Sequence, residues 1–222
     1  MLRIGKRLKS VAEEIGKVNT FADIGTDHGQ LIIYALEHGY AERAFAVDIS
    51  EKSLSKAVSA IAESGLSENV DFFVGDGLTT LKEIPDVIVI AGMGGNEIVH
   101  ILSSVSMNTK YILVPHSDAH VLREYLCSHG YKIEKDYVIF DGKYYAVITC
   151  VFGNTEYDRS KIVLGGDNPH TEEFEERIFD RKERIEKILS EKNMSLDSLQ
   201  PELREEYKEI NEWLRSKTHW TL

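Results

Sequence analysis

Two alternating patterns of hydrophobic residues run through roughly the first 130 residues of the chain. Short apolar runs bounded by polar turns alternate with stretches in which apolar residues recur at helical spacing. The runs predict strands, and the stretches predict amphipathic helices. The predicted strands are 20–24, 44–49, 70–74, 87–91 and 111–114, and the predicted helices are 4–15, 30–39, 51–64, 94–104 and 118–129. Strands separated by helices indicate crossover connections and a parallel sheet.

The pattern changes after this alternation. Residues 131–140 and 144–152 read as two strands joined by Asp141-Gly142-Lys143, and Asp-Gly between strands is typical of a tight hairpin. A parallel sheet that ends in an antiparallel hairpin is the order found in Rossmann-like methyltransferases that use S-adenosyl-L-methionine (SAM). We therefore predict an α/β fold of this class I type, with a mostly parallel seven-stranded sheet. A plain dinucleotide-binding domain would continue with further crossovers.

The last quarter of the chain is charged and periodic. It follows a turn or linker at residues 165–169, and its apolar residues repeat at helical spacing in two segments. The narrow apolar seams predict two antiparallel helices in a coiled-coil hairpin. We predict two domains, a SAM-binding domain at 1–166 and a helical hairpin at 167–222.

The composition narrows the cellular compartments in which the protein would be found. Of the 222 residues, 42% are hydrophobic, yet no apolar run approaches the roughly 18 residues that cross a bilayer. The N-terminus does not resemble a signal peptide. Cys127 and Cys150 lie far apart, which favours buried thiols in a reducing compartment over a disulfide or zinc site. We expect a cytoplasmic protein.

The net charge of -11 argues against binding nucleic acid through global charge. It leaves room for a local basic face near the N-terminus, formed by Arg3, Lys6, Arg7 and Lys9. The alternative interpretation is the solvated face of an ordinary helix.

The turn after the first predicted strand is rich in glycine. It reads Gly25-Thr26-Asp27-His28-Gly29, and this first strand-to-helix turn is where an adenosine-containing cofactor lies in doubly wound folds. Asp27 stands where the dinucleotide pattern G-x-G-x-x-G has its second glycine. A carboxylate there would repel a pyrophosphate and favour a cationic cofactor such as SAM. His28 is a candidate proton acceptor or base contact, or a residue that holds the turn by hydrogen bonds.

Acidic residues end three successive predicted strands. They are Asp23, Asp48 and Asp76. An acid at Asp48 can bind both ribose hydroxyls, and an acid at Asp76 can accept a hydrogen bond from an adenine amino group. Each alone has a simpler explanation, a helix N-terminal acid for Asp48 and a turn residue for Asp76. Together they favour a SAM site, which also includes Gly25, Ile49, Gly77, Ala91 and Gly92.

A second glycine-rich segment follows the fourth predicted strand and reads Ala91-Gly92-Met93-Gly94-Gly95-Asn96. Its glycines leave space for a flat base against the backbone. Met93 would cover a ring or simply fill the core, and Asn96 would pair with a base or cap the helix. We assign Met93, Gly94, Gly95 and Asn96 to substrate binding.

The segment Pro115-His116-Ser117-Asp118 ends the fifth predicted strand. It would line the mouth of the cleft, or Ser117 or Asp118 would cap the next helix. The histidines show no metal-ligand spacing, and the nucleophile motif G-x-S-x-G is absent from the sequence. We therefore expect no metal.

Three runs of the sequence resemble the bacterial TrmK family of tRNA (adenine-N1)-methyltransferases. They are 5–12 (G-K-R-L-K-S-V-A), 22–28 (A-D-I-G-T-D-H) and 91–95 (A-G-M-G-G). The resemblance covers nearly the whole chain, including the C-terminal hairpin. It implies methylation of N1 of adenine 22 in the D-arm of tRNA, with Asp23 and Gly25 in the SAM motif. It also makes Asp27 a candidate catalytic or substrate-positioning residue. Gly29 departs from the H-A-x-L of some relatives.

Several other functions remain open at this level. The same fold and acids would serve a SAM-dependent enzyme acting on a small molecule or a protein. Asp48 also fits an NAD-linked oxidoreductase, although the first turn and the terminal hairpin do not. A non-catalytic RNA-binding module is a further alternative. The helical hairpin would be a second tRNA-binding arm, a partner surface or a dimer contact, and a monomer and a weak dimer are both compatible with the sequence.

Overall fold

The structure is a computed structural model that describes residues 3–166 and 171–218. Its centre is a seven-stranded sheet with the order β3-β2-β1-β4-β5-β7-β6. The strands are β1 (Val18–Ile24), β2 (Ala41–Asp48), β3 (Val70–Val74), β4 (Val87–Ala91), β5 (Lys110–Val114), β6 (Tyr131–Phe140) and β7 (Tyr144–Phe152). β1 to β5 pair in parallel, and β7 runs antiparallel between β5 and β6. The predicted Rossmann-like sheet with a terminal antiparallel hairpin is confirmed.

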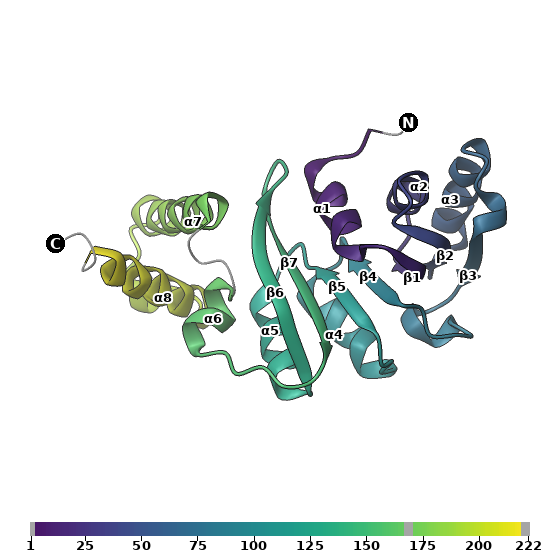
Figure 1. The fold of residues 1–222 in the computed structure, drawn as a ribbon. Helices are drawn as coiled ribbons and strands as arrows, with labels where there is room; N and C mark the ends of the chain where they lie inside the picture. Colours follow the sequence, from purple (N-terminus) through teal and green to yellow (C-terminus); the bar gives the residue numbers. More distant parts are fainter. Residues whose placement is uncertain (1–2, 167–170, 219–222) are drawn as a thin grey trace.

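Helices cover both faces of this sheet (Figure 1). One face carries α1 (Lys6–Ile15), α2 (Gln30–Glu37) and α3 (Glu51–Glu63), and the other carries α4 (Gly95–Ser104) and α5 (Ala119–Ser128). Within β4, Val89 packs toward the first helical layer, whereas Ile88 and Ile90 pack toward the second. Because both faces are buried, the central strands read as continuous apolar runs in the sequence.

The first helix begins at Lys6, two residues after the start of the predicted helix 4–15. Its N-cap is Gly5, which has no side chain to accept a backbone hydrogen bond. Asp141, in the turn between β6 and β7, accepts a bond from the Arg7 backbone N–H at 3.1 Å instead. The start of α1 is therefore stabilised by a residue distant in sequence.

Two long helices, α7 (Glu172–Glu191) and α8 (Pro201–Thr218), form the predicted C-terminal hairpin. The Arg181 guanidinium on α7 donates two bonds of 2.8 Å to the Glu206 carboxylate on α8. Their apolar seam packs together with Val138 of β6. The hairpin thus lies beyond the β6 edge of the sheet (Figure 1). Of the predicted linker 165–169, residues 167–169 lie outside the described residues, so the domain boundary stays a prediction.

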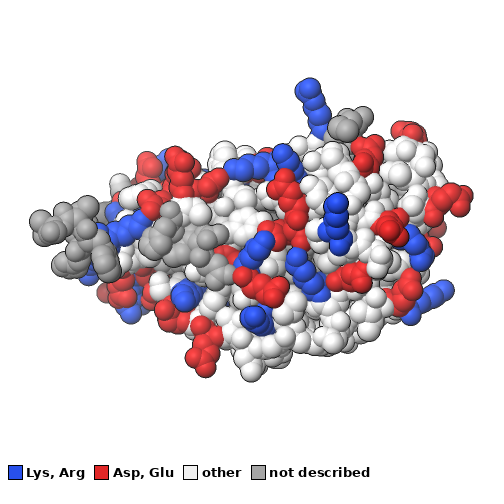
Figure 2. Space-filling view, viewed as in Figure 1, with Lys and Arg blue, Asp and Glu red and all other residues white. Residues whose placement is uncertain are grey.

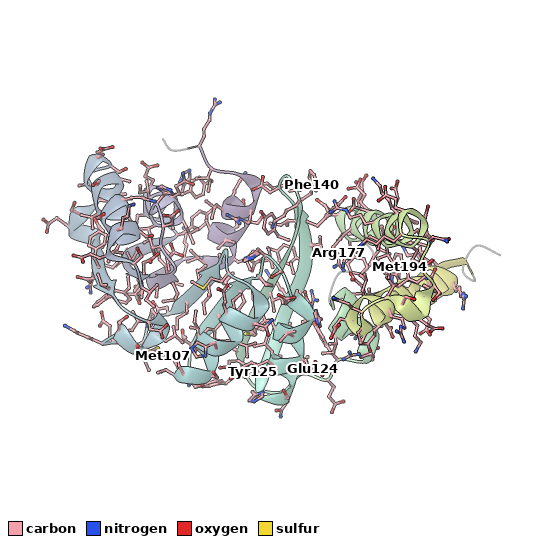
Figure 3. All side chains as sticks on the ribbon, turned by 180° about the vertical axis from the view of Figure 1, so that it is seen from behind. Met107, Glu124, Tyr125, Phe140, Arg177 and Met194 are labelled. Atoms are coloured by element: carbon pink, nitrogen blue, oxygen red, sulfur yellow. The ribbon has the colours of Figure 1, made fainter. Side chains whose placement is uncertain are left out.

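Sequence periodicity missed the short helix α6 (Arg159–Leu164), which is too short to show a helical repeat. α6 packs against α5 and α8 and connects the sheet to the hairpin. Next to α6, Arg123 of α5 and Asp136 of β6 form an ion pair, and the side chains of both residues are 1% exposed. Asp136 also accepts from the Gly166 backbone N–H, and Arg123 donates to the Ile162 carbonyl oxygen. Arg177 of α7 lies near this edge of the sheet and donates to the Leu164 carbonyl oxygen (Figure 3).

Candidate active site

The first strand-to-helix turn lies where the order of the sheet reverses. β1 pairs with β2 on one side and with β4 on the other, and crevices at such switch points bind ligands in open α/β sheets. The backbone N–H groups of Gly25 and Thr26 both donate to the Val47 carbonyl oxygen, at 2.8 and 3.0 Å. These bonds hold the turn against the end of β2 and open the crevice between β1 and β4.

A cavity of about 440 Å³ occupies this position. Seven of the predicted residues line it: Gly25, Asp48, Ile49, Asp76, Gly77, Met93 and Asn96. Its volume falls in the range of small-molecule and cofactor sites. The structure therefore brings together residues from the ends of β1, β2, β3 and β4. Asp23, Ala91 and Gly92, which we also predicted at the site, do not line this cavity.

Gly25 shapes one wall of the cavity. Its φ of +87° lies in the left-handed region, where a side chain is strained. A Cβ atom at this position would come within 2.5 Å of the Met93 Cε atom, which belongs to the segment after β4. Glycine thus allows the two glycine-rich segments to approach each other. Met93 lines the cavity, and its assignment to substrate binding stays a prediction.

Asp48 and Ile49 form the wall at the end of β2. The Asp48 carboxylate accepts a bond of 2.7 Å from the Ser50 backbone N–H. The Ser50 hydroxyl in turn caps α3 by accepting from Ser53, so the helix cap is Ser50 rather than Asp48. Ile49 is 72% exposed although it is a large apolar residue on a cavity wall. A flat apolar ring placed in the cavity would cover it.

Asp23 lies below the cavity rather than on its wall. Its side chain is buried, and burial raises the pKa of this carboxyl to about 6. The neighbouring charge of Asp48 acts in the same direction, and the Thr26 hydroxyl partly offsets both. The raised pKa follows mainly from desolvation of the charged form of this carboxyl.

Asp27 and His28 lie outside the cavity lining. The Asp27 carboxylate pairs with the Lys56 ammonium of α3 and with the His28 Nε2 atom, each at 3.1 Å. Both side chains of the Asp27–His28 pair are 57% exposed. No sequence pattern indicated Lys56, because its contact with Asp27 joins the turn after β1 to helix α3, which follows β2. The predicted catalytic role of Asp27 and His28 stays a prediction.

The glycines after β4 bring the next two helices close together. A Cβ atom on Gly95 would lie 2.1 Å from the Asp118 carbonyl oxygen, so only glycine fits at the start of α4. The Gly95 N–H donates to the Ser117 carbonyl oxygen at 2.9 Å, and the His116 N–H donates to that of Met93 at the same distance. The segment after β4 and the segment after β5 are therefore one bonded unit.

Glu97 and His100 line the cavity and were missed by sequence analysis. They follow Asn96 on the first turns of α4, and Ile101 lies beside them on the same cavity wall. Helical spacing from Asn96 could have indicated His100, because residues three and four apart lie on one face of a helix. The Glu97 carboxylate also accepts a 2.7 Å bond from the Gly94 N–H and so stabilises the N-terminus of α4.

A second cavity of about 860 Å³ lies between the ends of β5 and β7 and the helical hairpin. The segment 115–121, the start of β7 and helices α7 and α8 line it. Basic and acidic side chains both contribute, including Arg177, Arg181, Arg184, Asp180, Glu205 and Glu206. Cavities on both sides of the Gly94-Gly95 segment give the carboxyl edge of the sheet room for two ligands.

The predicted basic face lies on and before α1, away from both cavities. Lys6 pairs with Glu173 of α7 at 2.8 Å, and the Arg7 guanidinium lies 4.9 Å from the centre of the Tyr145 ring. Arg3 and Lys9 are exposed. Figure 2 shows basic and acidic residues interspersed over the visible face, without one dominant basic patch among the described residues.

Residues 3–166 and 171–218 contain neither a metal-binding cluster nor a helix suited to a membrane. In this part of the chain, no cluster of three or more histidine, cysteine or acidic side chains could hold a metal ion. No helix there is long and apolar enough to cross a membrane.

Comparison with known proteins defines the class first. Residues 4–148 match the family model described as a methyltransferase domain. With the sheet order and the strand-end cavity, this makes the chain a Rossmann-like methyltransferase.

Individual relatives define the family. The chain is 34% identical over 172 residues to the tRNA (adenine(22)-N(1))-methyltransferase of Bacillus subtilis, covering 74% of this chain and 72% of the relative. The structure of M. capricolum TrmK with S-adenosyl-homocysteine matches with a TM-score of 0.81 at 25% identity, covering 96% of this chain and 98% of that one. A Streptococcus pneumoniae protein in complex with SAM matches with a TM-score of 0.84 at 26% identity, covering 96% and 100%. The chain belongs to the TrmK family of tRNA (adenine(22)-N(1))-methyltransferases.

Proposed function

We propose that this protein transfers a methyl group from SAM to N1 of adenine 22 in the D-arm of tRNA. The observation that carries the proposal is the strand-end cavity, where Gly25, Asp48, Asp76 and Met93 meet in a chain that belongs to the TrmK family. Membership of a methyltransferase family removes the reason to favour an NAD-linked oxidoreductase. Because tRNA is the proposed substrate, we place the enzyme in the cytoplasm. A monomer and a weak dimer are both compatible with the proposal.

The cavity residues fit SAM. Asp48, which ends β2, would bind the ribose hydroxyls, and Asp76, which follows β3, would accept from the adenine amino group. The exposed Ile49 side chain would pack against the adenine ring. Bound SAM supplies an electrophilic methyl group on a positively charged sulfur, and the acids around the cavity favour that charge. Gly25 keeps the wall free of a side chain where the cofactor lies.

The protein's main contribution is the positioning of two reactants at one strand edge. N1 of adenine lies on the Watson–Crick edge, so the target base has to leave its stack before transfer. Met93, Gly94, Gly95 and Asn96 are our proposed contacts for this base. A carboxylate near the base would stabilise the positive charge that the product carries, and Asp27, assisted by His28, is our proposal for that role.

The tRNA body would contact the basic residues on and before α1, namely Arg3, Lys6, Arg7 and Lys9. Lys6 also pairs with Glu173 of α7, so this surface continues onto the helical hairpin. The hairpin contains more acidic than basic residues. Its contribution to tRNA binding would therefore be local, through single side chains rather than net charge.

The primary test is incubation of the protein with labelled SAM and unmodified tRNA, followed by mapping of the methylated nucleotide. We expect one methyl group on N1 of adenine 22. A tRNA with guanine at position 22 is the matched control and should remain unlabelled. Label at another nucleotide, or label only on small molecules or proteins, would contradict the proposal.

Asp27→Ala tests the proposed role of Asp27. We expect SAM affinity to persist while the rate of methyl transfer falls by about 10²-fold or more. Lys56→Met is the matched control, because it removes the other half of the 3.1 Å ion pair and keeps the carboxylate. Full activity of Asp27→Ala would remove Asp27 from the chemistry, and an equal loss in Lys56→Met would assign the effect to the ion pair.

A further inference from the structure

Asp118 lies on the wall of the larger cavity and packs against the Gly94-Gly95 segment. It is the residue before α5, and it lines the larger cavity beside the hairpin. Its carbonyl oxygen lies where a Cβ atom on Gly95 would be, and a Cβ atom on Gly94 would lie 3.9 Å from its Oδ2 atom. Met93, the neighbour of Gly94, lines the cofactor cavity. Asp118 thus lies against the Gly94-Gly95 segment, which continues directly from the cavity-lining Met93.

The Asp118 carboxylate has no structural task that accounts for it. It occupies the N-cap position of α5, but its side chain accepts no bond from the helix backbone. The Ser117 hydroxyl donates a bond of 2.9 Å to its Oδ2 atom, which fixes its orientation. Its side chain is solvent-exposed. Most of its hydrogen-bond acceptor capacity is thus available to a ligand.

Several other acids on the walls of the larger cavity are paired with arginines. Glu206 pairs with Arg181, and Asp180 pairs with Arg184 at 2.9 Å. In residues 3–166 and 171–218, no lysine, arginine or histidine forms an ion pair with Asp118. Glu97, the other acid near Gly94, is already bound to the Gly94 N–H. Asp118 is thus the carboxylate at this edge that retains an uncompensated charge beside the glycine wall.

We infer that Asp118 recognises the target base by accepting a hydrogen bond from the exocyclic amino group of adenine, while Ser117 holds the carboxylate in place. This inference rests on the proposed function and adds the residue that selects adenine. Guanine presents a carbonyl oxygen at the position of that amino group. A carboxylate would repel the oxygen, so the same residue would accept adenine and reject guanine.

The chemistry of the transfer explains why an acceptor belongs here. The N1 lone pair forms the new N–C bond as the C–S bond breaks, and the electrons of that bond stay on sulfur as a neutral thioether. No proton leaves in this step, so the methylated base carries the positive charge. That charge is shared with the exocyclic amino group, whose hydrogen bond to a carboxylate strengthens as the charge develops.

The backbone conformation at Asp118 allows two substitutions that add no strain. Its φ of +54° is left-handed, a conformation that asparagine and glycine tolerate but alanine does not. Asp118→Asn removes the charge and Asp118→Gly removes the side chain, both without new backbone strain. Glu124→Gln is the matched control, because Glu124 lines the same cavity from within α5.

The experiment compares tRNAs that carry adenine or unsubstituted purine at position 22, since purine lacks only the amino group. For the wild-type protein we expect kcat/KM to be about 10²-fold higher with adenine, because a site built to bind a donor rejects the analogue without it. In Asp118→Gly this ratio should fall to within about threefold of one, with SAM affinity unchanged. Asp118→Asn keeps an amide oxygen that can accept a hydrogen bond, so it should lower the ratio only in part. Glu124→Gln should keep the wild-type ratio.

The outcomes separate this inference from the proposed function. Failure of the wild-type protein to methylate either tRNA would contradict the proposed function itself. A wild-type protein that prefers adenine, with the preference intact in both Asp118 variants, would overturn only the assignment to Asp118. Loss of the preference in Asp27→Asn instead would transfer the role to Asp27.

Discussion

The strand-end cavity and the junction between the sheet and the helical hairpin differ in the interactions that form them. The cavity is formed by strand ends and glycines, and the residues that line it lie at or after the carboxyl ends of β1, β2, β3 and β4. The junction depends on one buried ion pair, Arg123 with Asp136, and on backbone bonds from α6 and Gly166 to these two residues. One region is thus shaped by backbone conformation and the other by charge.

This difference shows how each region tolerates change. At the cavity, the sheet fixes the backbone, and a substitution affects mainly the space available to the cofactor. At the junction, the two charges are desolvated, so each depends on the other for its stability. We expect substitutions at the junction to affect folding first, and substitutions on the cavity wall to affect ligand binding first.

The largest effect should come from Asp136→Asn. This change leaves the Arg123 guanidinium buried without its counter-charge, which should lower the free energy of unfolding by about 3–5 kcal/mol. Urea denaturation at neutral pH measures it. The matched control is Glu205→Gln, which breaks a more exposed pair with Arg159 between α8 and α6 and should lose at most about 1 kcal/mol. Similar small losses in both variants would show that the junction does not depend on its buried charge.

Asp23→Asn should have the next largest effect, with the opposite sign. The folded protein holds the Asp23 pKa at about 6, above its ordinary value of 3.8. Between pH 3.8 and 6 the unfolded chain loses this proton before the folded chain does, so the wild-type protein loses stability as pH rises through this window. A neutral asparagine avoids the loss and should stabilise the protein by up to about 3 kcal/mol above pH 6.

Unfolding measured across pH tests the Asp23 prediction. The gain from Asp23→Asn should be absent below pH 3.8 and constant above about 6. Glu63→Gln removes a carboxylate from the exposed end of α3 and is the control for the general effect of removing one negative charge. A gain that is independent of pH would mean that burial does not raise the Asp23 pKa.

Gly25→Ala should separate ligand binding from stability. The left-handed backbone strains alanine by about 1–2 kcal/mol, and the new methyl group displaces the Met93 side chain. We expect SAM affinity, measured by isothermal titration, to fall by about tenfold or more. Gly39→Ala is the control, since its φ of +67° gives similar strain with open space around the new methyl group. Equal SAM affinity in the two variants would show that Gly25 does not shape the cofactor site.

The smallest effect concerns the surface where α1 meets α7. If Lys6 contacts a tRNA phosphate, Lys6→Gln should reduce the slope of log affinity against log salt by about one. Glu173→Gln frees Lys6 from its 2.8 Å ion pair and should leave that slope unchanged or steeper. Equal reduction of the slope in both variants would indicate that the pair positions the hairpin and does not bind RNA directly.

Much of the fold was accessible from the sequence because its signals are local. The strands of the parallel sheet are buried on both faces, so they read as apolar runs, and β3, β4, β6 and β7 have the predicted bounds. Asp48 ends β2 and Asp76 comes shortly after β3, and parallel strands bring such residues to one edge. The cofactor cavity was therefore largely predictable.

The sequence by itself determined the Rossmann-like sheet, the helical hairpin and the family, because periodicity and motifs are properties of neighbouring residues. Only the tertiary structure paired Asp27 with Lys56, buried Arg123 against Asp136 and placed Asp118 beside Gly94 and Gly95. Each of these contacts joins two different elements or connecting segments of the fold. Their geometry depends on how helices pack across the sheet, and no local pattern of residues encodes that packing.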